Sequence, residues 1–334
     1  MRRNSDMEVV PVVGRVESYS SLATLASCAA RYNFTYNEGL EPQGVDLPSH
    51  LGSALHAAFK VLYRGGWGGA ARLDEAKAAL TTTWGDVKPP LGAKKAWITL
   101  GYALARLETY VEDRSKSKTT LELADVVASF SEEMHAFDWI DSLGHLVHIR
   151  GVPDFVVRHE GKTYVVDHKT TTSGKYGISD FYPDTSKVMA DVVSERAEQQ
   201  KALEYTLGHQ LRVYAAMYEN LTGERVDGGL INAVWCGELA IGDWLDSKKQ
   251  PRKGAKDLIR IVSFGGEQLE MAHEWVRGNL IVRDACAASN VWPKNEHACD
   301  AFGGCPFIDL CLAPSAAARR ARMSNFKRRP SDAK

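Results

Sequence analysis

Several features are scarce or missing in this sequence of 334 residues. No apolar run approaches the ~18 residues that a membrane-spanning helix needs. The N-terminus reads MRRNSDMEVVPVV, and its short apolar stretch contains Glu8 and Pro11, so we do not expect a signal peptide. With 28 Gly and 12 Pro, usage is close to average, which excludes collagen-like and low-complexity chains. Six cysteines are too few for a disulfide scaffold.

The sequence also lacks an excess of charge of either sign. Its 41 basic and 42 acidic residues leave a net charge of −1, which excludes a uniformly basic nucleic-acid-coating protein. No G-x-x-x-x-G-K-[ST] motif occurs, so we expect no P-loop motor. Hydrophobic residues make up 44%, enough for a packed core in one large or two modest domains. We expect a cytoplasmic protein.

Hydrophobic periodicity separates a helical first third from a strand-rich middle. Leu51, Leu55 and Phe59 recur at helical spacing, whereas the segment 144–169 is rich in Val, Ile, Phe and Tyr broken by turn residues. The order of elements is typical of an α/β or α+β fold with a helical elaboration. The pattern predicts helices over 18–32, 48–63, 70–84, 92–112, 194–220 and 267–289, with strands within 144–169 and near 229–236 and 258–264.

Two strand-like segments flank the sequence HEGK at 159–162. If the central Glu-Gly pair is a two-residue turn, residue i of the first strand lies opposite residue 321 − i of the second, which places Asp154 opposite Asp167. Side chains alternate along a strand, so Lys169 shares the face of Asp167 while His168 points away. Two carboxylates and one ammonium group are therefore predicted to converge.

Two aspartates this close repel each other unless a cation lies between them. A hard divalent cation such as Mg²⁺ or Mn²⁺ prefers oxygen ligands and would meet that need. The alternative is a surface hairpin with an ordinary salt bridge between Asp167 and Lys169. The apolar run Tyr164-Val165-Val166 before the acid, and the matching register of Asp154, favour the metal site over that alternative.

Pro153-Asp154 followed by Asp167-His168-Lys169 resembles the PD-(D/E)XK nuclease superfamily, and within it the RecB-like branch that includes phage exonucleases and CRISPR-adaptation nucleases. Two further segments fit that branch. The segment 52–56 (GSALH) resembles its upstream G-x-x-x-H helix, and 210–214 (QLRVY) resembles its Q-x-x-x-Y helix. The resemblance spans residues 18–312. It implies a restriction-endonuclease-like core, with a mixed central sheet flanked by helices, plus a helical N-terminal elaboration.

The resemblance also implies roles for single residues. The metal ligands would be His56, Asp154, Asp167 and the backbone carbonyl of His168, with Mg²⁺ or Mn²⁺ as the cofactor. Catalytic roles would fall to Asp154, Asp167, Lys169, Gln210 and Tyr214. A supporting acid would be Glu132 or Glu133, and the sequence leaves that choice open.

Three of the six cysteines, Cys299, Cys305 and Cys311, lie within thirteen residues, which points to metal or cluster binding in a chain without a secretion signal. With Cys28 they resemble the split four-cysteine site of the same branch, which implies a [4Fe–4S] cluster in a C-terminal cysteine-rich loop at 291–312. A four-cysteine zinc site is the main alternative. We interpret Cys236 and Cys286 as structural residues.

Local basic segments are the candidate contacts to DNA. Residues Lys248, Lys249, Arg252, Lys253 and Lys256 form one such segment, and 319–329 forms another with six basic residues. We expect a short extension at 1–17, a single domain at 18–312 and a flexible basic tail at 313–334. Within the domain we expect a helical part at 18–120, a nuclease core at 121–290 and the cluster loop.

The sequence and its resemblance therefore predict a metal-dependent DNA nuclease. An exonuclease is favoured over an endonuclease, and the sequence leaves that choice open. The setting of this nuclease would be DNA processing, recombination or repair, with single-stranded or end-bearing DNA as substrate. A separate helicase, recombinase or CRISPR-adaptation protein is the expected kind of partner. The alternative is a non-catalytic DNA-binding protein of the same fold with an iron–sulfur or zinc site. The presence of Asp154, Asp167 and Lys169 favours the enzyme.

Overall fold

The computed structural model describes residues 15–89, 95–116, 120–129, 134–140, 146–151, 153–171, 209–237, 258–299 and 304–329. The chain divides into two compact units built from separated segments. Unit 1 takes residues 1–44, 133–151 and 270–334, and unit 2 takes residues 45–132 and 152–269. The sequence predicts a single domain at 18–312, whereas the structure divides the same span into two units. None of the helices in the described segments has the length and apolar composition that crossing a membrane requires.

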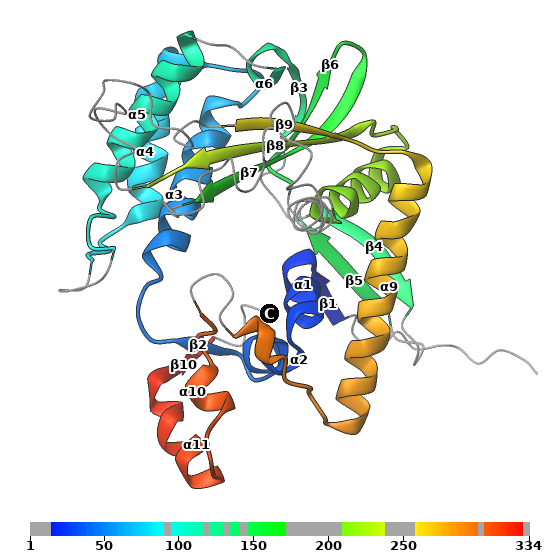
Figure 1. The fold of residues 1–334 in the computed structure, drawn as a ribbon. Helices are drawn as coiled ribbons and strands as arrows, with labels where there is room; N and C mark the ends of the chain where they lie inside the picture. The colour runs from blue at the N-terminus through cyan, green and yellow to red at the C-terminus, as the bar shows by residue number, and fades with distance from the viewer. Residues whose placement is uncertain are drawn as a thin grey trace, which may run out of the picture. The chain divides into compact units, whose positions relative to one another are not determined.

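Unit 2 is built on a mixed sheet whose described part has the strand order β3-β6-β7-β8-β9 (Figure 1). The pairs β3/β6, β6/β7 and β8/β9 are antiparallel, while β7 and β8 run parallel. The prediction of a mixed central sheet is confirmed. The strands are β3 Asp125–Ser129, β6 Phe155–His159, β7 Lys162–Thr171, β8 Gly228–Trp235 and β9 Leu258–Ser263.

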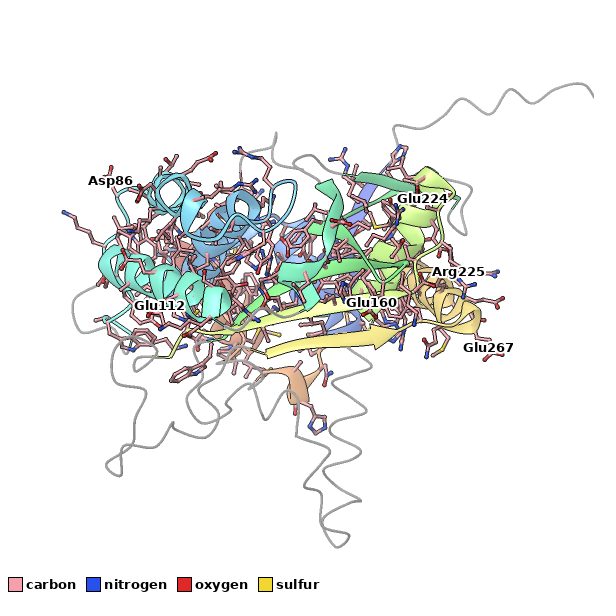
Figure 2. The ribbon with its side chains drawn as sticks, turned by 90° about the horizontal axis from the view of Figure 1, so that it is seen from above. Asp86, Glu112, Glu160, Glu224, Arg225 and Glu267 are labelled. Carbon is pink, nitrogen blue, oxygen red and sulfur yellow. The ribbon has the colours of Figure 1, made fainter. Side chains whose placement is uncertain are left out.

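The hairpin between β6 and β7 has the predicted register. Phe155 pairs with Val166 and His159 with Lys162, so each pair of residue numbers adds to 321. Glu160 and Gly161 both have positive φ, as a two-residue turn between strands of natural twist requires. Glu160, in the turn between His159 and Lys162, is exposed, and its side chain is labelled in Figure 2. The turn therefore fixes which residues of β6 and β7 lie opposite each other.

Helices cover one face of the sheet and form the main core of unit 2. Leu51, Leu55 and Phe59 of α3 are fully buried and pack with Phe155 and Val166 of the sheet. The predicted helix at 48–63 is thus confirmed, and its apolar stripe is the core-facing side. The helices of this layer and its short connections are α3 Leu47–Leu62, η2 Gly69–Arg72, α4 Leu73–Trp84, α5 Leu100–Lys116 and α6 Thr120–Leu123.

Unit 1 has two small sheets among its described residues. In the first, β1 pairs parallel with β5, which pairs antiparallel with β4, and in the second β10 pairs antiparallel with β2. The predicted helix at 18–32 is interrupted at Cys28, whose backbone is extended. The elements are β1 Arg15–Ser18, α1 Tyr19–Ser27, α2 Ala29–Tyr32, η1 Asn33–Asn37, β2 Leu40–Pro42, β4 Met134–Ile140, β5 Leu146–Gly151, α9 Gly266–Ser289 (which begins in unit 2), η5 Glu296–Ala298, α10 Ile308–Cys311, α11 Ala316–Arg322, η7 Met323–Asn325 and β10 Phe326–Arg328.

The expected flexible tail at 313–334 instead contains regular structure. α11 is capped by Ser315, whose side chain accepts a hydrogen bond from the N–H of Ala318. Phe326 stacks on Phe307 with ring centroids 5.2 Å apart, which anchors β10 in a small apolar cluster. This apolar anchor and the pairing with β2 give residues 316–328 the contacts that a flexible tail would lack.

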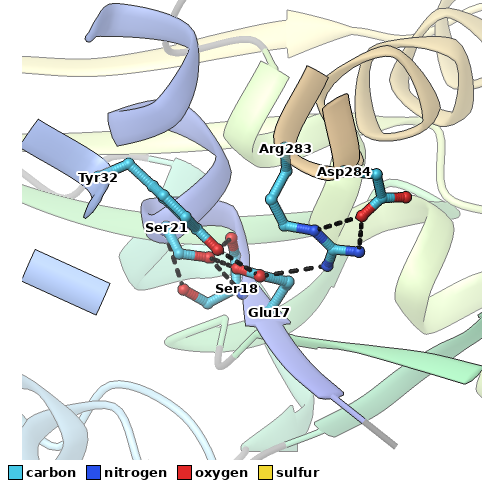
Figure 3. Close-up of polar contacts among 6 residues, drawn as sticks. All are labelled: Glu17, Ser18, Ser21, Tyr32, Arg283 and Asp284. Atoms are coloured by element: carbon cyan, nitrogen blue, oxygen red, sulfur yellow. Dashed lines mark hydrogen bonds and ion pairs between the residues drawn. The ribbon is translucent and has the colours of Figure 1, made fainter. Parts of the chain in front are cut away.

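A buried ion-pair network joins the N-terminal and C-terminal parts of unit 1 (Figure 3). The Arg283 guanidinium on α9 lies 3.3 Å from Glu17 of β1 and also bonds the neighbouring Asp284. Glu17 accepts further hydrogen bonds from the hydroxyls of Tyr32 and Ser21, at 2.5 and 2.6 Å. The burial of Arg283 is tolerated because both of its carboxylate partners are buried with it.

We predict that Arg283→Met lowers the free energy of unfolding by about 3–5 kcal/mol, since it leaves buried carboxylates without their cation. Urea unfolding followed by circular dichroism measures this change. The matched control is Arg64→Met, which removes a solvent-exposed pair with Glu75 and should cost about 0–1 kcal/mol. Equal losses in the two variants would contradict the stabilising role of the buried network.

Candidate active site

The centre of the candidate site is Asp154, which directly precedes β6 and is buried. One of its carboxylate oxygens lies 3.1 Å from Nδ1 of His56, on α3. The other accepts the backbone N–H of His168 at 2.6 Å, from the middle of β7. Three elements of unit 2 therefore meet at one carboxylate, and the structure brings His56 to it as the sequence suggested.

Gly52 allows α3 to approach β7 closely enough for this contact. A Cβ atom at Gly52 would lie 2.9 Å from the hydroxyl oxygen of Thr170, closer than real Cβ atoms come to other atoms. His56 lies four residues further along α3, on the same side of the helix. The spacing G-x-x-x-H thus has a physical reason, because the glycine brings in the helix that carries the histidine.

Asp167 and Lys169 share one face of β7, as the alternation of side chains predicted. Nζ of Lys169 lies 2.8 Å from one carboxylate oxygen of Asp167 and donates to the side-chain oxygen of Gln210 at 2.7 Å. The amide nitrogen of Gln210 lies 3.3 Å from Asp167 and 3.0 Å from the hydroxyl of Tyr214. These four side chains form one connected polar cluster. Asp167 is buried, whereas Lys169 is about one-third exposed and so accessible to a substrate.

The helix that carries Gln210 and Tyr214 is described over 209–222. Its Leu211 packs on Gly229 of β8, where a Cβ atom would lie 2.6 Å from a Leu211 methyl carbon. Gln210 and Tyr214 are one helical turn apart and therefore lie on the same side. The glycine in β8 lets this helix approach the sheet and brings both polar side chains to Asp167 and Lys169.

Burial and opposite charge set the pKa values in this cluster. Burial alone would raise the pKa of Asp154, but the interactions with His56 and the His168 N–H outweigh it and lower that pKa. Burial would lower the pKa of His56, yet the hydrogen bond and charge of Asp154 raise it. The pKa of Asp167 is raised, chiefly by burial and also by the charge of Asp154, against the effect of Lys169. Asp167 therefore lies where additional positive charge is favourable.

The donor set fits a hard divalent cation. His56 offers an imidazole nitrogen, and Asp154 and Asp167 offer carboxylate oxygens that interact electrostatically with each other and with His56. The three are held by protein partners: Asp154 by His56, and Asp167 by Lys169 and Gln210. Within the described residues no three His, Cys, Asp or Glu side chains already stand in metal-binding geometry. A bound cation would thus have to replace some of these pairings.

In unit 1 the first and last parts of the chain meet near the four cysteines. Cys28 sits at the break between α1 and α2, and its neighbour Ser27 accepts a hydrogen bond from the Asn295 side chain at 2.8 Å. The N–H of Cys305 donates to the carbonyl of Cys299 at 2.6 Å. These contacts bring the segment before Cys299 to the helix break at Cys28.

Three of the thiols lie close enough to the fourth, Cys311, to influence its pKa. Burial raises the pKa of Cys311, and the charges of Cys28, Cys305 and Cys299 raise it further, while Lys294 opposes them. All four side chains are partly buried. Cys236 and Cys286 are buried elsewhere, Cys286 within α9, in keeping with their interpretation as structural residues.

Two groups of sequence-predicted residues lie outside the described residues. They are the candidate supporting acids Glu132 and Glu133, and the basic residues Lys248, Lys249, Arg252, Lys253 and Lys256.

Sequence reasoning missed the buried polar side chain of Asn232, which lies behind the site. It pairs directly with His168 across the parallel strands β7 and β8. A signal was present, because Asn232 interrupts the otherwise apolar and fully buried strand GGLINAVW. A buried amide needs hydrogen-bond partners, so its position predicts a polar network.

The fold and the paired acids beside a lysine define a class of nucleases. The family model described as the PD-(D/E)XK nuclease superfamily matches residues 17–312, and the chain belongs to that superfamily. This span includes every described residue of the candidate site. Comparison with curated proteins found no match.

Two solved structures are similar to this chain at low identity. One is a protein of Eubacterium rectale named as a candidate exonuclease, with 16% identity, 86% coverage of each chain and a TM-score of 0.46. The other is the protein SSO0001, with 13% identity, coverage of 79% of this chain and 84% of the other, and a TM-score of 0.31.

We predict that Gly52→Val displaces α3 from β7 and lowers the free energy of unfolding by about 1–3 kcal/mol, the usual cost of overpacking. Nuclease activity should fall more steeply than stability, because His56 moves away from Asp154. Activity assays well below the melting temperature, together with thermal unfolding, separate the two effects. Gly101→Val is the control, since Gly101 on α5 is exposed and a Cβ atom there would have its nearest neighbour 3.8 Å away. Unchanged activity in Gly52→Val would contradict the close-approach role.

Proposed function

We propose that this nuclease-family protein hydrolyses DNA with a divalent metal cofactor and acts as an exonuclease. The observation that supports this most is the bonding of Asp167 and Lys169 of β7 to each other and to Gln210. Asp154 lies close enough to act electrostatically on Asp167. A scaffold without catalysis would not need to keep a buried carboxylate and an accessible ammonium group together.

The metal ligands in this proposal are His56, Asp154, Asp167 and the backbone carbonyl of His168. A bound Mg²⁺ or Mn²⁺ lowers the pKa of its water and stabilises charge on the phosphate. The His56 side chain and the His168 N–H hold Asp154 in its ionised form, which is the form that binds a cation. The raised pKa of Asp167 reflects the same need for positive charge.

Lys169 has the position of the group that handles the attacking water. Its ammonium is fixed between Asp167 and Gln210 at 2.8 and 2.7 Å, and its exposure leaves one side open to solvent. There Lys169 orients the water as an ammonium, or takes the water's proton as a neutral amine. In its charged form it offsets the negative charge that develops on the phosphate. Gln210 and Tyr214 hold the strand that is cut, by hydrogen bonding or by stacking on the Tyr214 ring.

The C-terminal basic segment supports DNA as the substrate. Arg320 and Arg328 are exposed on α11 and β10, whereas Arg319 and Arg329 form ion pairs with Glu38 and Glu41. Exposed arginines neutralise phosphates and make binding depend on salt. The expected substrate is single-stranded or end-bearing DNA. The expected setting is DNA processing, recombination or repair in a prokaryotic or phage-infected cell, beside a helicase, recombinase or CRISPR-adaptation partner.

We further propose that Cys28, Cys299, Cys305 and Cys311 hold a [4Fe–4S] cluster. Four thiolates are the usual ligand set of such a cluster. The contact between Asn295 and Ser27, which joins segments 268 residues apart, supports it. The effect of the other three thiols on Cys311 supports it as well. A cluster there would cross-link both ends of unit 1 and limit the freedom of its unfolded chain. A zinc ion on the same four cysteines is the alternative.

We predict that Lys169→Ala lowers DNA cleavage with Mg²⁺ or Mn²⁺ by about 10²–10³-fold, since it removes a charge that stabilises the transition state. End-labelled single- and double-stranded DNA, with products sized over time, measures the rate and separates exonuclease from endonuclease action. The control is Lys162→Ala, an exposed lysine at the start of the same strand, which should cut at the wild-type rate.

A Lys169→Ala protein that cuts as fast as wild type would contradict the site. If the wild-type protein binds DNA but never cuts it, the non-catalytic alternative is correct.

We predict that protein purified without oxygen is brown and contains iron, and that Cys305→Ser loses both the colour and the iron. The remaining three thiolates cannot complete the cluster. Cys286→Ser is the control, because Cys286 is buried in α9 of the same unit and should keep the colour. A colourless preparation with stoichiometric zinc would establish the zinc alternative.

A further inference from the structure

Behind the candidate site, on the face of the sheet covered by α3 and α5, lies a buried polar network that the proposed chemistry does not use. It connects the middle of β7 to three helices of unit 2. Its side chains are buried in an otherwise apolar core, so each hydrogen bond in it matters for the arrangement of the others. The members are Tyr63, Tyr110, Arg114, Glu122, His168 and Asn232.

Arg114 determines which way the Asn232 amide faces. A guanidinium only donates hydrogen bonds, so the group that Arg114 contacts at 2.9 Å is the amide oxygen. The amide nitrogen of Asn232 then donates to Nδ1 of His168 at 2.6 Å and to the hydroxyl of Tyr110 at 2.8 Å. Nδ1 of His168 therefore accepts, and the ring is neutral with its proton on Nε2.

The hydrogen bonds from Tyr110 to Glu122 also have a defined donor and acceptor at each step. Tyr110 accepts from Asn232, so its own hydrogen points to the Tyr63 hydroxyl at 2.6 Å. Tyr63 in turn donates to the carboxylate of Glu122 at 2.6 Å. Glu122 also lies 3.7 Å from Nε of Arg114, which closes the network with an ion pair. Every donor and acceptor along it has one defined orientation.

Aromatic rings pack around the His168 imidazole, and Tyr63 and His56 contribute two of them, with ring centroids 5.5 and 5.9 Å away. Phe59 and Phe155 lie with ring centroids 4.7 and 5.2 Å away. Nε2 of His168 is buried and has no hydrogen-bond partner among the described residues. The bond from Asn232 is accordingly the polar contact that sets the rotation of this imidazole.

The His168 ring is joined to the candidate site through its own backbone. Its N–H donates to Asp154 at 2.6 Å, and its neighbours along β7 are Asp167 and Lys169. A rotation of His168 about β7 would move its N–H, its carbonyl and both neighbouring side chains together. The hydrogen bond from Asn232 to the ring thus limits motion of the peptide groups at the site.

We propose that Asn232 is a positioning residue for the metal site, acting through the imidazole of His168. The proposal rests on the proposed function, since it assigns the network to the placement of the metal-binding peptide of β7. Arg114 and Glu122 orient Asn232, and Asn232 orients His168. Removal of a residue that orients a metal ligand typically lowers the metal affinity 10- to 100-fold.

The first experiment measures Mn²⁺ binding to chelator-treated full-length protein without DNA, by electron paramagnetic resonance titration. Asn232→Leu should weaken Mn²⁺ binding about tenfold. His56→Ala is the positive control and should also weaken it. Tyr102→Phe is the matched control for a lost buried hydrogen bond on α5, where Tyr102 donates to the Gly237 carbonyl, and its Mn²⁺ affinity should equal that of wild type.

A second variant separates the positioning role from general damage to the core. Asn232→Asp keeps the size and the acceptor for Arg114, but it presents an oxygen instead of an N–H to His168 and to the Tyr110 hydroxyl. The Tyr110 hydroxyl can turn its hydrogen toward that oxygen. The His168 ring should then carry its proton on Nδ1, whereas in wild type it carries it on Nε2. Long-range ¹H–¹⁵N correlation spectra of ¹⁵N-histidine-labelled protein distinguish the two tautomers. Mn²⁺ affinity in Asn232→Asp should lie within about threefold of wild type, because the ring remains held.

Each outcome decides the question. Wild-type Mn²⁺ affinity in a folded Asn232→Leu protein overturns the positioning role and leaves the proposed function standing. If Asn232→Leu does not fold, the tautomer of His168 decides. A ring that keeps its proton on Nε2 in Asn232→Asp overturns the positioning role. A ring that carries its proton on Nδ1 in wild type overturns it as well. A wild-type protein that binds no Mn²⁺ overturns the proposed metal site itself and the positioning role with it.

Discussion

The two-residue turn at Glu160-Gly161 sets the register of β6 against β7, and the chemistry of unit 2 depends on that register. It places the start of β6, directly after Asp154, beside the part of β7 that carries Asp167 and Lys169. A shift by one residue would exchange the two faces of β7. Asp167 would then point into the apolar helical layer. The positive φ at both turn positions makes the required turn geometry possible, so a local backbone feature determines where the charged groups gather.

The second constraint on the structure is that buried charged groups need compensating partners. The two units differ in how far they provide them. In unit 2 the interactions with His56 and the His168 N–H lower the pKa of Asp154, whereas burial raises the pKa of Asp167 despite Lys169. The remaining demand for positive charge at Asp167 suits a site that binds a cation. In unit 1 the Arg283 network is closed, with carboxylates and hydroxyl donors around one guanidinium. A closed network stabilises and orients its members, whereas a partly compensated one is available for chemistry.

Much of the local structure could be predicted because it depends on neighbours in sequence. The helix at 48–63, the strands of the hairpin and the common face of Asp167 and Lys169 follow from periodicity and turn chemistry. The break of the first helix at Cys28 could not be predicted from periodicity, since the apolar spacing continues across it. The strand β10 was missed for another reason: its pairing with β2 joins segments about 280 residues apart, and its basic composition resembles that of a flexible tail.

By itself the sequence determined the hairpin, the face on which each of its residues lies and the identity of the candidate catalytic groups. Only the tertiary structure decided how closely the helix that carries His56 approaches them, because the approach of α3 depends on the space left by Gly52 beside Thr170. It also decided the role of the apolar face of β7. There Asn232 and Arg114 come from a neighbouring strand and a distant helix, and no local pattern encodes their hydrogen bond to each other. Such contacts arise only when the elements pack, since packing alone brings together donors and acceptors that are far apart in sequence.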